Sequence, residues 1–179
     1  MNAIAITPAN ADNPDLIALY ESAFPKEEQI PYPDLEGLID KMNLDFRAWY
    51  EGKQFVGLTI VYRRADLNWF WYFAVKAELR GRGYGQSILE RLTAAHADKP
   101  LILDIESPRQ PAANREQRQH RYGFYLRNGF RDTGVGKSFE GIDYTILMAG
   151  DGTFTQQDYD DILQSLRRFW SRMPEEQET

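Results

Sequence analysis

The chain of 179 residues contains no cysteine and only two histidines. Without cysteine it can form no disulfide, no thiolate metal site and no cysteine nucleophile, which excludes catalysis through an acyl-cysteine intermediate. His96 lies near the end of a predicted helix, and His120 lies among arginines. Neither fits a metal-ligand pattern, so we expect both at the surface and no metal site.

The chain also lacks a long apolar run and an excess of basic residues. No segment reaches membrane-spanning length, and Met1–Pro8 lacks the basic start of a signal peptide. We therefore expect a cytoplasmic protein with no membrane partner. The formal net charge is −6, whereas duplex-binding domains usually present a basic face, so we expect no nucleic-acid partner.

Apolar periodicity and turn residues predict an α/β protein, with a mixed sheet and helices on both faces. The predicted strands are Ala3–Thr7, Phe46–Tyr50, Gln54–Tyr62, Leu67–Val75, Leu101–Glu106, Phe130–Val135 and Phe139–Met148. The predicted helices are Pro14 to Phe24, Leu35–Met42, Gly83–His96, Arg118–Arg127 and Thr155–Arg172. Loops are predicted at Lys26–Pro33 and Ser107–Gln117, and the turn of the last hairpin at Gly136-Lys137.

The pattern predicts one domain over residues 1–150, followed by a helix and an acidic tail over residues 151–179. This last helix carries an apolar stripe at helical spacing: Tyr159, Ile162, Leu163, Leu166, Phe169 and Trp170. We expect the stripe to pack against the domain's own sheet, with a homodimer contact as the alternative. The tail Pro174–Thr179 is expected to be frayed.

The most informative segment is an aromatic strand ending at Val75, followed by the basic, glycine-rich loop Arg80–Gly85, which opens a helix. Glycine has no Cβ, so successive N–H groups can turn to one side and let an anion approach. The helix adds unpaired N–H groups and its positive dipole end. Arg80 and Arg82 add charge. The segment predicts a pyrophosphate site, with a tight turn bearing two solvated arginines as the alternative.

Two other nucleotide-binding loops fit this segment less well. A dinucleotide-binding loop needs a third glycine or alanine where Gln86 stands, and it follows its strand at once, whereas four residues separate Val75 from Arg80. Asp104 does stand near the position of that fold's ribose-binding acid. A P-loop requires Gly-Lys-Ser/Thr after the glycines, and this chain lacks it.

Two segments of the chain resemble the signature motifs of the GNAT superfamily of N-acetyltransferases. Val75–Gly85 is similar to motif A, whose core Arg/Gln-x-x-Gly-x-Gly/Ala is met by Arg80, Gly83 and Gly85. Arg121–Phe130 is similar to motif B, with its Tyr-x-x-x-Gly-Phe signature. The residues that meet this signature are Tyr125, Gly129 and Phe130. The order of elements suits the family from Ile4 to about Met148.

The resemblance implies a mostly antiparallel sheet, and acetyl-CoA or another acyl-CoA as co-substrate. In the family, the loop N–H groups hold the CoA pyrophosphate, and the preceding strand pairs with pantetheine along an edge left open by a bulge. The donor-binding residues implied here are Phe73, Ala74, Val75, Arg80, Gly81, Arg82, Gly83, Tyr84, Gly85 and Gln86. Arg118, where the family often has asparagine, and Arg121 are expected near a CoA phosphate.

The resemblance also implies an N-acetyltransferase that moves the acetyl group directly to a primary amine of a small molecule or peptide. Tyr125 is similar to the family's general acid, because a neutral tyrosine can donate a proton to the leaving thiolate. Asp104 and Glu106 alternate onto one face of a strand. We expect Glu106 to be the base or amine anchor, with Glu27 and Glu28 second, or water alone. A CoA-binding regulatory module without turnover is the alternative function.

The sequence does not identify the amine. We expect the acceptor to meet the Phe24–Leu35 loop and the closing hairpin. Phe24, Tyr32 and Trp49 are candidates for apolar walls there, although aromatic residues at such positions are more often part of a core.

Overall fold

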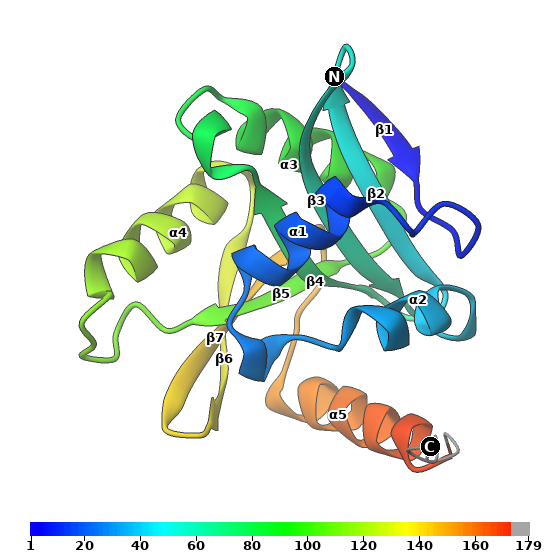
Figure 1. Ribbon diagram of the computed structural model, residues 1–179. Helices are drawn as coiled ribbons and strands as arrows, with labels where there is room; N and C mark the ends of the chain where they lie inside the picture. The colour runs from blue at the N-terminus through cyan, green and yellow to red at the C-terminus, as the bar shows by residue number, and fades with distance from the viewer. Residues whose placement is uncertain (173–179) are drawn as a thin grey trace.

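The computed structural model describes residues 1–172, so the tail Pro174–Thr179 lies outside the described residues. Seven strands form one sheet in the order β1-β2-β3-β4-β5-β7-β6, in which β4 and β5 are the one parallel pair described (Figure 1). The strands are β1 (Asn2–Ala5), β2 (Leu44–Glu51), β3 (Gln54–Arg63), β4 (Asn68–Val75), β5 (Leu101–Glu106), β6 (Arg131–Phe139) and β7 (Ile142–Ala149). The predicted mixed, mostly antiparallel sheet is confirmed.

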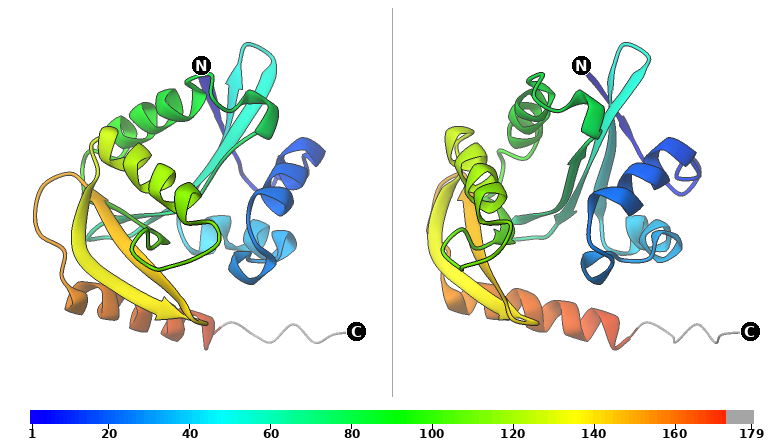
Figure 2. Two further views of the ribbon diagram at one scale, coloured as in Figure 1. Left: turned by 90° about the vertical axis from the view of Figure 1, so that its left-hand side faces the viewer. Right: turned by 60° about the vertical axis from the view of Figure 1, so that its left-hand side comes forward.

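Helices cover both faces of this sheet, as predicted. The helices are α1 (Pro14–Ala23), α2 (Tyr32–Lys41), α3 (Tyr84–Ala95), α4 (Arg115–Arg127) and α5 (Gln156–Trp170), with single 3-10 turns η1 (Lys26–Glu28) and η2 (Ala77–Leu79). Figure 2 shows α1 and α2 on one side of the sheet and α3 and α4 on the other. None of the described helices has the length and apolar character needed to cross a membrane.

Helix α5 packs on the face of the sheet that α1 and α2 cover. Its buried residues Tyr159 and Ile162 join a cluster with Trp69, Ile102 and Met148 from the sheet. Further along the helix, Leu166 and Phe169 pack against the core beneath α1 and α2. The helix begins with a capping box, in which Thr155 and Asp158 exchange side-chain and backbone hydrogen bonds. The apolar stripe of α5 therefore contributes to the core of its own domain.

The turn of the last hairpin lies at Glu140-Gly141, where both residues have positive φ, so the prediction of Gly136-Lys137 was wrong. Gly136 instead lies within β6, where a Cβ atom would come 2.7 Å from the Tyr144 carbonyl oxygen. The residue is needed for the close approach of two strands rather than for a turn.

Two helices begin earlier than predicted. Helix α4 begins at Arg115, inside the predicted Ser107–Gln117 loop, and α2 begins at Tyr32, inside the predicted Lys26–Pro33 loop. The proline that follows Tyr32 is tolerated because N–H groups in the first turn have no intrahelical partner.

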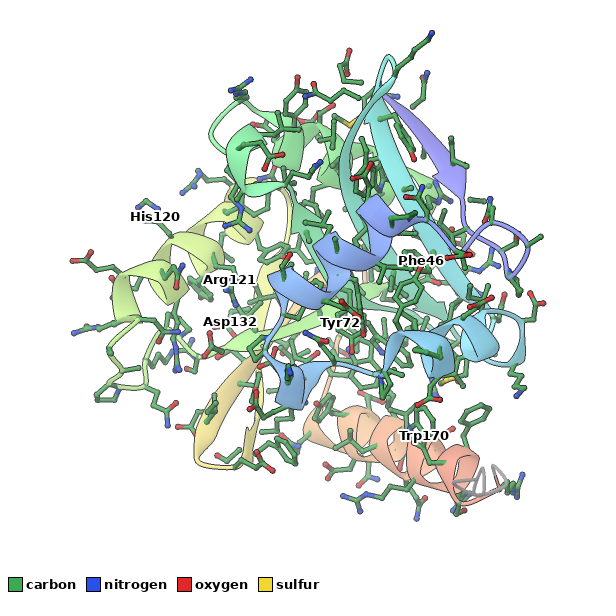
Figure 3. All side chains as sticks on the ribbon, viewed as in Figure 1. Phe46, Tyr72, His120, Arg121, Asp132 and Trp170 are labelled. Atoms are coloured by element: carbon green, nitrogen blue, oxygen red, sulfur yellow. The ribbon has the colours of Figure 1, made fainter. Side chains whose placement is uncertain are left out.

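His96 was predicted to be exposed but is buried, with Nε2 2.9 Å from Asp45 Oδ2. Burial raises the pKa of Asp45, but the hydrogen bonds from His96 and Arg47 outweigh it and bring that pKa to about 2. His120 is exposed on α4, as expected (Figure 3). Within residues 1–172, no group of three or more His, Asp or Glu side chains is placed to hold a metal ion.

Candidate active site

A cleft of about 770 Å³ opens where β4 and β5 separate. The two strands pair only at Asn68 with Leu101 and at Trp69 with Ile102. On its other side, β4 pairs with β3 along its length, except at a register shift that leaves Trp71 out of the ladder. The β5-facing edge of β4 after Trp69 therefore has no strand partner among the described residues. An extended ligand can add to such an edge by backbone hydrogen bonds.

The glycine-rich loop carries the end of β4 into α3. Gly83 is the N-cap of α3 and lies in the left-handed region at φ 81°, where glycine is favoured. The first helical hydrogen bond of α3 runs from the Ser87 N–H to the Gly83 carbonyl, at 3.1 Å. No side chain of the described residues caps this end. The N–H groups of Tyr84, Gly85 and Gln86 are thus available to an anion.

The loop and the strand edge border one cavity. The predicted donor-binding residues that line the cleft are Phe73, Ala74, Val75, Arg80, Gly85 and Arg121. The start of α3 lies next to two aromatic rings, because a Cβ at Gly85 would make ordinary van der Waals contact with Phe124 at 3.6 Å and with Phe73 at 3.8 Å. Gly81, Arg82, Gly83, Tyr84 and Gln86 complete the loop but are outside the described lining.

Tyr125 of α4 also lines the cleft. Its side chain packs between Phe124 and Phe130, with both ring centroids 5.4 Å away. Burial raises the pKa of Tyr125 to about 12, although the nearby Arg121 charge partly opposes this. The hydroxyl therefore keeps its proton throughout the physiological pH range and can donate it.

Glu106 and Arg118 pair with each other instead of facing a ligand. Arg118 is 6% exposed, and its Nη2 donates to Glu106 Oε1 at 2.8 Å, while Nη1 donates to Gln110 Oε1 at 3.1 Å. Arg121 Nη1 lies 3.6 Å from the other Glu106 oxygen. Arg118 stands in the first turn of α4 and lies over the end of β5, where it contacts Glu106. Arg118 was expected near a CoA phosphate, but the structure pairs it with Glu106. Glu106 itself is outside the described lining of the cleft.

On the far side of the cleft, the wall comes from the η1 loop, the β6–β7 hairpin and α5. It includes Phe24, Glu28, Tyr144 and Trp170, and Figure 3 labels Trp170 on α5. Of the expected apolar walls, only Phe24 lines the cleft, because Tyr32 and Trp49 are buried in the core. Glu28 was only a second candidate, no local pattern marked Tyr144, and Trp170 was predicted only as part of an apolar stripe.

The comparisons with known proteins agree on one family. The family model described as "Acetyltransferase (GNAT) domain" matches residues 45–132, which include both motif segments. A comparison with curated protein sequences finds no match.

Solved structures share the fold at low sequence identity. A GNAT-family protein from Bacteroides thetaiotaomicron has a TM-score of 0.76 at 21% identity, with 95% of this chain and 98% of that chain covered. An aminoglycoside 6'-N-acetyltransferase complexed with coenzyme A has a TM-score of 0.63 at 14% identity, covering 83% of this chain and 96% of that one. A GNAT acetyltransferase from Elizabethkingia anophelis with acetyl-CoA bound has a TM-score of 0.57 at 16% identity, with the same shares covered.

Proposed function

We propose that the chain, whose residues 45–132 match the acetyltransferase (GNAT) domain model, transfers an acetyl group from acetyl-CoA directly to a primary amine. One observation carries this proposal: the start of α3 at Gly85, the open edge of β4 and the Tyr125 side chain all line one cleft. The relatives complexed with coenzyme A and acetyl-CoA support the choice of donor.

The residues at this cleft fit the donor from the pyrophosphate to the thioester. The N–H groups of Tyr84, Gly85 and Gln86 would hold the pyrophosphate with the dipole of α3 behind them. Arg80 lines the cleft beside them, and its Nε donates to the Val75 carbonyl at 3.2 Å, which fixes the side chain at the strand end. The backbone of Phe73–Val75 would pair with the pantetheine amides.

Direct transfer requires a nucleophilic amine and a protonated leaving group. The amine nitrogen forms a bond to the acetyl carbon, the carbon–sulfur bond breaks, and the sulfur accepts a proton. Tyr125 is the donor that we assign to this proton, because its hydroxyl is neutral and the residue lines the cleft. We propose that Glu106 is not the base. It positions Arg118 and Arg121 on α4, since both arginines already contact its carboxylate.

A thiol-release assay tests this function. We expect CoA release from acetyl-CoA to depend on an added primary amine, with one N-acetylated product per thiol by mass spectrometry. Because the chain has no cysteine, all thiol detected comes from CoA. Omitting the amine is the control for hydrolysis. Tight acetyl-CoA binding without turnover on polyamines, aminoglycosides, aromatic amines, amino acids and peptide N-termini would instead favour a non-catalytic CoA-binding module.

A further inference from the structure

The acceptor side of the cleft presents one carboxylate on a fixed loop. Glu28 stands at the end of η1, and its Oε1 accepts a hydrogen bond from the Tyr144 hydroxyl at 2.8 Å. Its backbone carbonyl accepts another from Tyr72, at 2.7 Å. The Tyr72 hydroxyl also accepts the Ile30 N–H at 3.3 Å, so the loop is attached to β4 on both sides of Gln29. Oε2 of Glu28 has no hydrogen-bond partner within residues 1–172 and is available to a ligand.

The two tyrosines can hold Glu28 in place at any physiological pH. Burial raises the pKa of Tyr72 above its ordinary value. Burial and the hydrogen bond to Glu28 both raise the pKa of Tyr144. Both hydroxyls therefore remain protonated. Tyr144 continues to donate to the carboxylate, and Tyr72 to the backbone of the loop.

The second carboxylate of the cleft is already neutralised. Asp104 Oδ1 accepts from Trp69 Nε1 at 3.1 Å, and Oδ2 accepts from Lys137 Nζ at 2.7 Å. Burial would lower the pKa of Lys137, but the Asp104 charge outweighs burial and raises it, so the lysine is cationic. Glu28 and Asp104 are the acidic residues in the described lining. Glu28 is thus the one carboxylate there without a cationic partner.

The rest of this wall is aromatic. Phe24 packs edge-on against Tyr72, with ring centroids 4.9 Å apart. Phe139 at the tip of β6 and Trp170 on α5 are 56% and 40% exposed, and both line the cleft. Ligand pockets are lined mainly by apolar and aromatic side chains, so these two residues give the cleft surface that an apolar ligand can contact. Phe139 and Trp170 belong to elements that are distant in the chain, and the fold brings both to the same cleft.

From this arrangement we infer that the acceptor is a monoamine carrying an aromatic group, with Glu28 binding its amine and the aromatic wall binding its ring. This inference rests on the proposed function. A polyamine would bring a second ammonium to a wall whose described lining holds no second unneutralised carboxylate. Before transfer the bound ammonium gives one proton to Glu28, which leaves a neutral amine. The nitrogen then bonds to the acetyl carbon, the carbon–sulfur bond breaks, and the departing sulfur takes the proton of Tyr125. The second proton of the nitrogen is released to water, from which Tyr125 is reprotonated.

Steady-state kinetics with three acceptors test the inference: 2-phenylethylamine, ethylamine and spermidine. Burial of the phenyl ring should raise kcat/KM for 2-phenylethylamine at least about tenfold above that for ethylamine. Spermidine should be no better than ethylamine. Glu28→Gln should raise the KM for 2-phenylethylamine by about tenfold or more while the Kd for acetyl-CoA stays the same. Glu21→Gln is the control, because Glu21 is exposed on α1 and outside the described lining.

Acetyl-CoA binding, measured by calorimetry on the same preparations, separates two kinds of failure. The substrate class is wrong if acetyl-CoA binds but kcat/KM for spermidine or ethylamine equals that for 2-phenylethylamine. It is also wrong if acetyl-CoA binds and 2-phenylethylamine is not acetylated. If Glu28→Gln behaves like Glu21→Gln, the role of Glu28 is wrong. In both cases the donor half of the proposed function stands. If wild type does not bind acetyl-CoA, the proposed function fails with the inference.

Discussion

Gly83→Glu is expected to weaken acetyl-CoA binding by about 100-fold or more. The substitution places a carboxylate at the N-cap of α3, where the pyrophosphate would sit against free N–H groups. A hydrogen bond to a charged group contributes about 1.5–3 kcal/mol. Because about 1.4 kcal/mol is a tenfold change in Kd, losing two such bonds accounts for the expected loss even before charge repulsion is counted.

The control for this variant is Gly152→Glu. Gly152 also has a positive φ, 96° against 81° for Gly83, and a Cβ at either position would have open space within 4 Å. Both variants therefore carry similar backbone strain, of about 1–2 kcal/mol, and the same added charge. Calorimetric titration should give an unchanged Kd for Gly152→Glu. Equal Kd values for Gly83→Glu and wild type would contradict the pyrophosphate site.

Tyr125→Phe is expected to lower kcat by about 100-fold or more, within the range that general acids contribute. The KM for acetyl-CoA should change little, since the variant keeps the ring between Phe124 and Phe130.

Tyr125 is the acid only while protonated, and its pKa is raised to about 12. Its active form is therefore present throughout neutral pH and is lost only as the pH rises through that value. Wild-type kcat should show no decline from this group below about pH 10.

Tyr122→Phe is the matched control on the same helix. The Tyr122 hydroxyl donates to Asp132 at 3.0 Å, and the residue is outside the described lining of the cleft. The pre-steady-state and steady-state rates of Tyr122→Phe, measured across pH, should stay close to those of wild type. A Tyr125→Phe profile that coincides with the wild-type profile would remove Tyr125 from the chemistry and leave it a packing role.

The form of the glycine-rich loop could be predicted from the sequence because its geometry is local. Gly83 and Gly85 stand at a strand-to-helix junction, and short-range backbone geometry alone turns the N–H groups of that junction to one side. Tyr125 follows from a second local pattern on one helix. The start of α4 could not be fixed in the same way, since helix ends in polar segments are poorly marked. The contact of Arg118 with Glu106 joins α4 to the end of β5, and no local pattern specifies that packing.

The acceptor side could not be predicted because it depends on packing between distant elements. The hydrogen bond between Glu28 and Tyr144 joins residues separated by 116 positions. Trp170 reaches the cleft only because α5 packs on the sheet through Tyr159 and Ile162. The sequence showed the apolar stripe of α5, but the stripe does not specify which of its residues ends beside a ligand. The neutralisation of Asp104 by Lys137 likewise depends on the register of three strands.

A crystal structure of the chain with CoA is the most direct test of the central claim, that one cleft binds the donor and presents its sulfur to Tyr125. We expect pyrophosphate oxygens within hydrogen-bonding distance of the N–H groups of Tyr84, Gly85 and Gln86. We also expect pantetheine to pair with the open edge of β4 at Phe73–Val75, and the sulfur to lie beside the Tyr125 hydroxyl. A pyrophosphate bound elsewhere, or a sulfur remote from Tyr125, would show that this cleft does not bind the donor in the way we propose.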